Sequence, residues 1–238
     1  MDLKSKVVLV TGSAKGIGKS IIEKFASLGC NVVINYNTSE LEAIKLKQEI
    51  ENKYNIKALI VKADITNEDE VQNMIDKTIK EFSKIDILIN NAAYTCDNPI
   101  YEKTKNEFMR VLEVNVVGTF LVSKYASNHI KDGIIVNISS TDAIDTYNEY
   151  NIDYSASKAA INSLTKSLAL ILSNIKVIAL MPPFVNTEIV RTMDQEYLQS
   201  ELKRINQKRL LEPSEVANKL IEILKSDIKT GSIIRIEE

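Results

Sequence analysis

Tyr154 and Lys158 are a pair of residues whose types and spacing could do acid–base chemistry. They stand four residues apart at the start of a predicted helix, so they lie on one helix face. A free tyrosine titrates near about 10 and is a poor acid–base group at neutral pH. An ammonium beside it favours the phenolate and brings the phenol pKa toward the working range. The pair predicts a proton donor and acceptor, and the alternative is an exposed tyrosine beside a solvated lysine.

A second candidate site is the glycine-rich segment 11–18, where Gly12, Gly16 and Gly18 follow an apolar strand and open a helix. Such a turn directs backbone N–H groups and a helix N-terminus toward one point, which suits an anion such as pyrophosphate. Glycine adopts φ values that other residues avoid, and it leaves no Cβ between backbone and phosphate. The spacing is neither the general dinucleotide fingerprint nor the P-loop. Alone, the segment also fits a glycine turn without a ligand.

The composition excludes several classes of protein. The 30 basic and 32 acidic residues nearly cancel, so no overall charge favours nucleic acid or an anionic membrane surface. Cys30 and Cys96 have no companions at metal-ligand spacing, which argues against a disulfide framework or a metal site. No apolar run approaches the ~20 residues of a membrane span. We expect a cytoplasmic protein that binds neither nucleic acid nor membrane and holds no metal.

Apolar strands alternate with helical patterns along the whole chain. This rhythm predicts an α/β fold with a doubly wound parallel sheet, helices on both faces and a single domain over residues 1–238. The strands are expected at 7–10, 31–35, 58–61, 85–90, 134–138, 176–180 and 232–236, and the later helices at about 40–53, 67–82, 105–130, 154–173 and 215–225. The charged segment 187–208 lacks a strand pattern and is predicted to be a helical lid over the substrate.

Several polar residues and turn residues fall where predicted strands end. Ligands of open parallel sheets bind beyond the carboxyl ends of the strands. The residues at such ends are Gly12, Asp64, Asn90, Ser139, Ser140 and Pro182. Their convergence predicts a binding site at that edge of the sheet.

Taken together, these residues resemble the short-chain dehydrogenase/reductase family over nearly the whole chain. Residues 11–18 look like its cofactor turn, residues 90–92 its strand-end motif, Asn115 its helix asparagine, Ser140 its serine, and Tyr154 with Lys158 its hallmark pair. The resemblance implies a Rossmann-like fold and hydride transfer between a nicotinamide cofactor and a carbonyl or alcohol carbon.

The resemblance also implies catalytic roles. Tyr154 would give its proton to the carbonyl oxygen as hydride arrives, while Ser140 hydrogen-bonds to that oxygen. Lys158 would hold the nicotinamide ribose and lower the pKa of Tyr154, and Asn115 would position a water that links Lys158 to solvent. Ser139 is the alternative for the serine role, since adjacent hydroxyls on a strand point to opposite sides.

Cofactor contacts follow from the same resemblance. Asp64 with Ile65 would contact the adenine, and Val185 with Thr187 would hold the nicotinamide amide. Pro183 departs from the family, which usually has glycine there; proline removes an N–H and fixes φ. The full predicted set is Gly12, Ser13, Lys15, Gly16, Ile17, Gly18, Tyr36, Asp64, Ile65, Asn91, Ala92, Tyr154, Lys158, Pro182, Val185 and Thr187.

The end of the second strand bears on cofactor choice. An NAD site usually places an Asp or Glu there, on the adenosine ribose. Residues 35–39 contain no carboxylate, and Lys15 could pair with a 2′-phosphate. NADP(H) is therefore favoured over NAD(H), and the alternative for Lys15 is a solvated side chain.

Among family members, residues 33–36 and 209–217 look closest to the 3-oxoacyl-carrier-protein reductases. The best candidate activity is thus the reduction of a 3-oxoacyl thioester, which could be carrier-protein-bound. Acidic residues between Ser140 and Tyr154 would oppose an acidic carrier protein. These are Asp142, Asp145, Glu149 and Asp153, and we expect them to lie in a solvated loop.

Two other functions compete with this one. The first is an NAD(P)-dependent dehydrogenase of a small alcohol or sugar, and the second is a non-catalytic NADP-binding scaffold. As in the family, a homodimer or homotetramer is expected, with dimerisation through the helices at 105–130 and 154–173.

Overall fold

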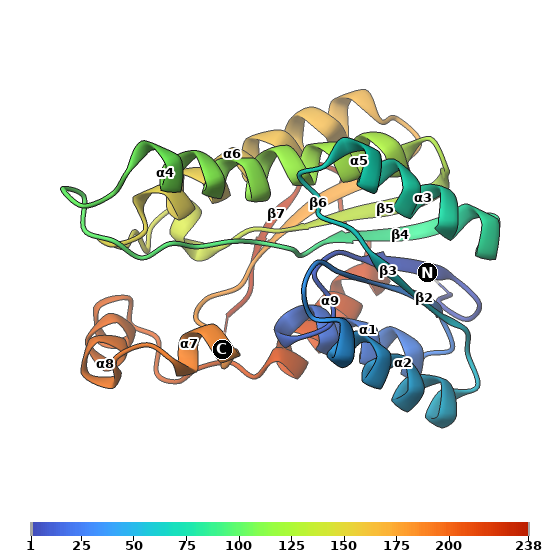
Figure 1. Cartoon of the computed structure of the whole chain (residues 1–238), viewed down its shortest axis with the longest axis horizontal. Coiled ribbons are helices and arrows are strands. Elements are labelled where there is room, and N and C mark those ends of the chain that lie inside the picture. Colours follow the sequence, from blue (N-terminus) through green and yellow to red (C-terminus); the bar gives the residue numbers. More distant parts are fainter. Residues whose placement is uncertain (1, 238) are drawn as a thin grey trace.

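The computed structural model describes residues 2–237, which form a seven-stranded parallel sheet between two layers of helices (Figure 1). The strand order is β3-β2-β1-β4-β5-β6-β7. The strands are β1 (Val7–Val10), β2 (Asn31–Tyr36), β3 (Ala58–Lys62), β4 (Ile85–Asn90), β5 (Ile130–Ile138), β6 (Lys176–Met181) and β7 (Ile233–Arg235). The predicted doubly wound sheet is confirmed.

The helices divide between the two faces of the sheet. One face is covered by α1 (Gly16–Ser27), α2 (Glu40–Tyr54) and α9 (Pro213–Lys225), and the other by α3 (Glu68–Phe82), α5 (Thr119–Ser127) and α6 (Ile152–Ile171). Alternate side chains of each strand supply the two cores: Val8 and Val10 pack with α1, whereas Val7 and Leu9 face the opposite layer. Burial on both faces explains the continuous apolar runs of the strands.

The strand order reverses at β1, which pairs with both β2 and β4. At such a switch point, the loops that leave neighbouring strands diverge and open a crevice. The loops after β1, β4, β5 and β6 therefore surround one site, although Asn90, one of the predicted strand-end residues, is buried and donates to Ser123 and Asn137 instead.

The predicted helix over 105–130 is interrupted. It consists of α4 (Lys105–Leu112), a π-helical segment η1 (Glu113–Gly118) and α5. The interruption brings Gly118 against Ile65, so closely that a Cβ on Gly118 would lie 2.6 Å from Ile65 Cδ1. The hydroxyl of Thr119, the first residue of α5, donates to the carbonyl of Asn115 in η1 at 2.8 Å. A period of 3.6 residues cannot predict such a bulge, which widens the turn by one residue.

Two other boundaries differ from the prediction. β5 starts at Ile130 rather than 134, because its first residues pair with β4 through a register shift. Lys131, Asp132 and Gly133 interrupt the apolar run there, and Asp132 has a φ of +52°. α6 starts at Ile152, so Tyr154 already lies inside its first turn.

Two short helices occupy the segment predicted to be a lid, α7 (Glu188–Arg191) and α8 (Gln195–Arg204). In Figure 1 they lie beyond the end of β6, apart from the two main layers. They bury a small core of their own, formed by Val190, Leu198 and Leu202. The segment is thus packed separately from the sheet.

Candidate active site

The glycine turn after β1 is held open by backbone geometry. Gly12 and Gly16 have φ values of +59° and +57°, which side chains with a Cβ rarely adopt. A Cβ on Gly12 would also lie 2.9 Å from the Cα of Ala92. Asn35 fixes the turn from β2, because its Oδ1 accepts a hydrogen bond from the Gly12 N–H at 3.0 Å. Sequence reasoning had not singled out Asn35.

Ser13 and Gly18 do not line the groove beside this turn, contrary to their predicted role as cofactor contacts. Ser13 is fully buried, and its hydroxyl donates to the Val10 carbonyl at 2.8 Å. Gly18 packs so closely that a Cβ would lie 2.6 Å from Asn91 Nδ2. Both residues shape the turn from behind.

An elongated groove of about 580 Å³ runs from the end of β2 across the glycine turn. Its lining includes the remaining residues predicted to bind the adenosine and phosphate parts of a dinucleotide: Gly12, Lys15, Gly16, Ile17, Tyr36, Asp64, Ile65, Asn91 and Ala92. α1 begins at Gly16, so the end of the helix that favours anions lies at the groove. The shape and this anion-binding end fit a dinucleotide.

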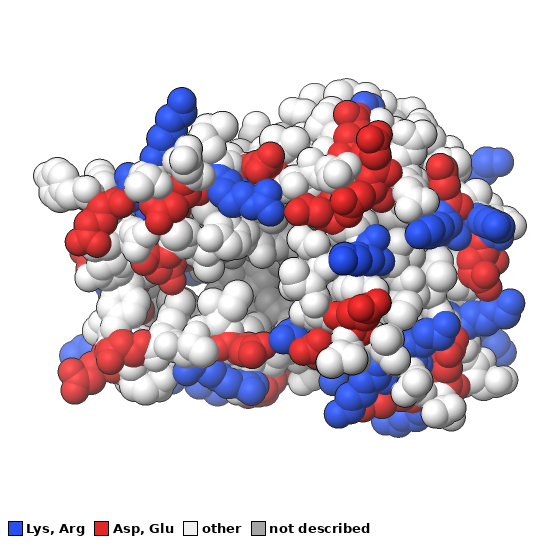
Figure 2. Space-filling model, in the orientation of Figure 1, with Lys and Arg blue, Asp and Glu red and all other residues white. Residues whose placement is uncertain are grey.

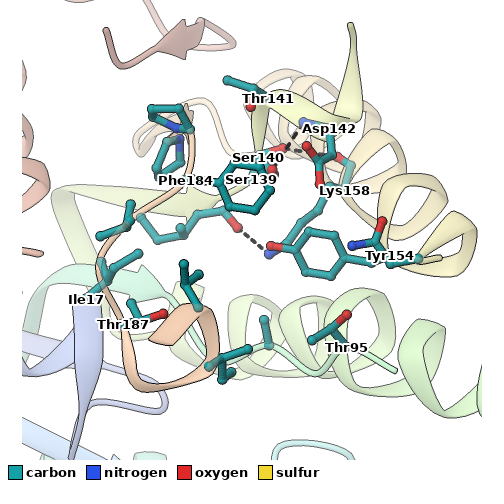
Figure 3. Close-up of a pocket in the computed structure, with 18 of the residues that line it drawn as sticks. Ile17, Thr95, Ser139, Ser140, Thr141, Asp142, Tyr154, Lys158, Phe184 and Thr187 are labelled. Atoms are coloured by element: carbon teal, nitrogen blue, oxygen red, sulfur yellow. Dashed lines mark hydrogen bonds between the residues drawn. The ribbon is translucent and has the colours of Figure 1, made fainter. Parts of the chain in front are cut away.

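The groove continues into a smaller cavity of about 190 Å³, and Ile17, Asn91 and Thr187 line both. This cavity, here named the catalytic pocket, contains Tyr154 and Lys158. Figure 3 shows the two side chains lying side by side, with Lys158 Nζ 5.3 Å from the centre of the Tyr154 ring. The predicted helical spacing therefore brings both groups into one pocket.

Lys158 points its ammonium at the carbonyl of Ile138, to which it donates at 2.8 Å. Burial lowers the pKa of Lys158 to about 8. Burial and the nearby Asp142 carboxylate raise the pKa of Tyr154 well above its usual value, and a hydrogen bond with Ser140 offsets only part of this. Burial dominates the net shift, and the lowering of this pKa by Lys158 stays a prediction. The phenol is protonated at neutral pH, as a proton donor must be.

Of the two serines that end β5, Ser140 is the one beside the phenol. The Ser140 hydroxyl accepts a hydrogen bond from the Asp142 N–H at 3.1 Å (Figure 3). The Ser139 hydroxyl instead donates to the backbone carbonyl of Lys158 at 3.2 Å. Ser139 therefore ties β5 to α6, whereas Ser140 lies in the pocket beside the phenol.

Asn115 lies behind the pocket and is buried. Its Oδ1 accepts from the Tyr94 N–H at 2.7 Å, while its Nδ2 donates to the Ser157 hydroxyl at 2.9 Å. These contacts join the loop after β4 to α6, on which Tyr154 stands. The role of Asn115 in a water relay stays a prediction.

The comparisons with known proteins agree with this geometry. Residues 6–198 match the family described as short chain dehydrogenase. The chain belongs to the short chain dehydrogenase family. It is therefore an NAD(P)-dependent oxidoreductase, as the resemblance implied.

Two curated relatives of this dehydrogenase are about equally similar to it. Glucose 1-dehydrogenase 2 of Bacillus subtilis is 36% identical over 91% of this chain and 86% of its own length. The 3-oxoacyl-acyl-carrier-protein reductase FabG of Aquifex aeolicus is 36% identical over 99% of this chain and 97% of its own. A crystal structure of a short chain dehydrogenase from Burkholderia cenocepacia in complex with NADP superposes with a TM-score of 0.92, at 27% identity, covering 100% of this chain and 98% of that one.

The residues around Lys15 differ from the expectation for this dehydrogenase. Lys15 Nζ lies 3.1 Å from Glu42 and 3.4 Å from Glu188, and the Glu42 hydrogen bond is the main cause that raises the Lys15 pKa. Tyr36 donates its hydroxyl to Glu40 at 2.9 Å. The sequence prediction found no carboxylate at the end of β2, but Glu40 and Glu42 in the first turn of α2 lie beside Tyr36 and Lys15. This end of the groove thus combines one cation with nearby acids.

Arg110 of α4 also lines the groove and was missed from the sequence. Its guanidinium lies 3.4 Å from Asp64, the residue predicted to contact adenine. Burial alone would raise the pKa of Asp64, but hydrogen bonds from Thr66 and the Arg110 charge outweigh it and hold that pKa below its usual value. Arg110 could have been found only from its tertiary contacts with Asp64 and Thr66, in the loop after β3.

The expected solvated loop between Ser140 and Tyr154 is wrong for two of its four acids. Asp142 is only 9% exposed and lines the catalytic pocket. Asp153 is fully buried and forms an ion pair with Lys103 at 3.0 Å. Asp145 pairs with Arg235 at the surface, as an acid in an open loop can. An acidic residue type does not by itself reveal a buried partner fifty positions away.

The segment after β6 completes the pocket. Pro182, Val185 and Thr187, predicted to border the nicotinamide, all line it, and so does Pro183. Gln207 holds this segment, because its Oε1 accepts from the Phe184 N–H at 3.0 Å. Ile189 and Val190 of α7 form an apolar part of the pocket wall. The substrate side is therefore mostly apolar, with Asp142 and Lys158 as buried charged groups.

Membrane-spanning helices and metal-ligating clusters are both absent from residues 2–237. Within that range, no helix is long and apolar enough to cross a membrane. Nor does the described chain gather three or more His, Cys, Asp or Glu side chains into a group that could hold a metal ion.

Proposed function

We propose that this dehydrogenase reduces a carbonyl group with NADP(H), with Tyr154 as the proton donor. The observation that carries the proposal is the position of the Tyr154 phenol beside Ser140 and Lys158, in a pocket that opens into the dinucleotide-sized groove. The non-catalytic scaffold is disfavoured because Ser140, Tyr154 and Lys158 line one cavity.

In the proposed mechanism, NADPH held in the groove supplies the hydride. Ser140 and Tyr154 hydrogen-bond to the substrate carbonyl oxygen, so negative charge that develops on it is stabilised. Tyr154 then transfers its phenolic proton to this oxygen, which yields the alcohol. The Lys158 ammonium stabilises the phenolate that remains. Because the pocket is largely apolar, these charge interactions are stronger than they would be in water.

NADP(H) remains the proposed cofactor because Lys15 lines the groove near the end of β2. A 2′-phosphate there would compete with Glu42 and Glu188 for the Lys15 ammonium. The substitution Tyr36→Asp should shift preference toward NADH, since a carboxylate repels the 2′-phosphate and binds the ribose hydroxyls. An unchanged ratio of the NADPH and NADH dissociation constants would contradict this placement.

Two substrate classes follow from the relatives. The Aquifex aeolicus relative suggests a 3-oxoacyl thioester, free or carrier-protein-bound, and the Bacillus subtilis relative suggests a small alcohol or sugar. The catalytic pocket favours the small hydroxylated class, because the acids Asp97 and Asp142 line it. Charges of both signs are mixed over the face drawn in Figure 2, and no large basic area appears there to receive an acidic carrier protein.

We also propose that residues 187–208 close over the substrate as a lid. Ile189, Val190 and Met193 already line the pocket, and the small separate core of α7 and α8 allows them to move as a unit. A closed lid would exclude water from the pocket, which would strengthen the hydrogen bonds of Tyr154 and Ser140 to the substrate oxygen.

A homodimer is proposed through the helices on the α4–α6 side. Val117 and Phe120 are more than two-fifths exposed, and so are Leu170 and Ile171 at the end of α6. Exposed apolar residues on neighbouring helices are typical of an interface between copies. Light scattering during gel filtration distinguishes a dimer from a monomer or tetramer.

The decisive experiment mixes the purified protein with NADPH and a panel of acetoacetyl thioesters, ketones and sugars. Absorbance of the reduced cofactor reports turnover, and alcohols with NADP⁺ test the reverse direction. Tight NADPH binding without oxidation by any compound would favour the scaffold over the enzyme.

A further inference from the structure

Asp142 is a buried carboxylate that the reaction as described does not use. It lies in η2 (Thr141–Ala143), directly after Ser140, and lines the same pocket as Tyr154 (Figure 3). The Thr146 hydroxyl donates to its Oδ1 at 2.8 Å. Across residues 2–237 no donor reaches its Oδ2, and no cation forms an ion pair with it. Oδ2 is not one of the fully buried atoms that lack a partner, so it is open to the pocket and available to a ligand.

The neighbouring charges do not satisfy this atom. Arg204 lies near Asp142 but makes two hydrogen bonds to Glu201, at 2.8 and 2.7 Å. The Arg204 charge is therefore neutralised by Glu201 rather than by Asp142. Lys158 lies near it too, but its ammonium is bonded to the Ile138 carbonyl. A carboxylate oxygen that faces a binding pocket can accept a hydrogen bond from a ligand, and hydrogen bonds to charged groups are among the stronger ones.

We propose that Asp142 accepts a hydrogen bond from a hydroxyl group of the substrate. This hydroxyl lies close to the carbonyl group whose oxygen hydrogen-bonds to Tyr154 and Ser140. The substrate class is then a hydroxyketone in the reducing direction and a diol in the oxidising direction. This inference rests on the proposed function and narrows it. Asp142 is a specificity residue, because it would contact a part of the substrate that does not react.

Other substrate chemistries fit the pocket less well. A protonated amine beside Asp142 would also face the Lys158 ammonium, which lines the same cavity. A carboxylate would meet Asp142 and Asp97. A 3-oxoacyl thioester carries no donor next to its ketone, so it would leave Asp142 Oδ2 without a partner. A neutral hydroxyl satisfies the acceptor without adding charge.

The test compares two ketones of nearly equal shape, acetoin and methyl isopropyl ketone, which differ by a hydroxyl in place of a methyl. With NADPH, the wild-type protein should prefer acetoin in kcat/KM by about ten- to a hundredfold, the range for a hydrogen bond to a charged group. Asp142→Ala should bring this ratio close to one, because the acceptor is gone. Asp142→Asn should give an intermediate ratio, because it keeps a neutral acceptor.

Asp145→Asn is the matched control. It removes a charge three residues away on the same loop, where Asp145 pairs with Arg235 outside the pocket. The acetoin preference should stay at the wild-type value in this variant. Equal loss of preference in the Asp142 and Asp145 variants would overturn the inference, since the effect would then be general electrostatics.

Two further measurements separate this inference from the proposed function. Aminoacetone and pyruvate are tested beside acetoin, and a preference for either over acetoin would overturn the hydroxyl assignment. Acetoin is also titrated into Tyr154→Phe loaded with NADPH, with cofactor fluorescence as the readout of binding, and into the double variant with Asp142→Ala. If no ketone is reduced, the proposed function fails, and the titration alone tests the inference. Weaker acetoin binding in the double variant than in Tyr154→Phe supports the inference, and equal acetoin binding overturns it.

Discussion

The cofactor half and the substrate half of this molecule are built by different means. Beside the groove, the structure depends mainly on backbone conformation, at Gly12 and Gly16. Around the catalytic pocket, it depends mainly on buried polar side chains, through Asp142 and the Lys103–Asp153 pair. The first kind of construction is local in sequence, whereas the second joins residues that are far apart. The two halves should therefore respond differently to substitution.

The largest effect on the substrate half is expected from Tyr154→Phe. Removing the proton donor should lower kcat about a hundred- to ten-thousandfold, the usual range for general acid catalysis. NADPH affinity should change little, because the phenol ring remains. Tyr147→Phe is the control, since Tyr147 is 61% exposed. Comparable losses in both variants, or a loss of affinity alone, would contradict the role of Tyr154.

The buried Lys103–Asp153 pair should dominate the stability of the substrate half. Lys103→Met leaves the Asp153 carboxylate buried without a cation, which should lower the free energy of unfolding by about 3–5 kcal/mol. Adding Asp153→Leu should recover much of this loss, because the orphaned charge is then removed. Urea unfolding of the two variants and the wild type measures both steps. If the double variant is less stable than Lys103→Met, the pair is not held together mainly by charge compensation.

The sequence predicted the cofactor half more completely because its signals are local. Three glycines between a strand and a helix indicate a tight turn directly from the sequence. The alternation of apolar strands with helical patterns predicted the parallel sheet. The aspartates of the substrate half have no local sequence pattern that indicates whether they are buried. Asp142 and Asp153 have the same residue type as Asp145 and differ only in what packs against them. Lys103, Arg110 and the bulge at η1 were invisible for the same reason, since each depends on tertiary contacts.

Gly18→Ala probes the backbone construction of the cofactor half. Its new Cβ would lie 2.6 Å from Asn91 Nδ2 and 2.7 Å from the Gly12 carbonyl. Such overpacking should cost about 1–3 kcal/mol of unfolding free energy and weaken NADPH binding. Gly231→Ala is the comparison: its φ of +80° is unfavourable for alanine, but the nearest contact is 3.6 Å away and outside the groove. It should therefore lose stability without losing NADPH affinity.

Lys158 makes the substrate half sensitive to pH. Its pKa is about 8 in the folded protein and about 10.4 in an unfolded chain, so the unfolded state binds more protons between these values. Stability contributed by Lys158 must then rise as pH increases through that window. The free energy of unfolding of the wild type minus that of Lys158→Met should increase by on the order of 2 kcal/mol from pH 7 to 10. The difference cancels titrations that both proteins share, such as that of Cys30. A difference that falls with pH would mean that Lys158 is not desolvated.

The smallest effect is expected where the cofactor half uses exposed charges. Lys15 and Glu188 are both well exposed, so their pairing adds little to stability. Glu188→Gln should leave unfolding unchanged but raise the preference for NADPH over NADH severalfold, because Lys15 no longer divides its charge between Glu188 and a 2′-phosphate. Lys15→Ala should lower that preference, and both effects should shrink at high salt. Dissociation constants for the two cofactors at two salt concentrations measure this. An effect that high salt leaves unchanged would indicate a desolvated contact at Lys15, and the contrast between an exposed cofactor end and a buried substrate end would then fail.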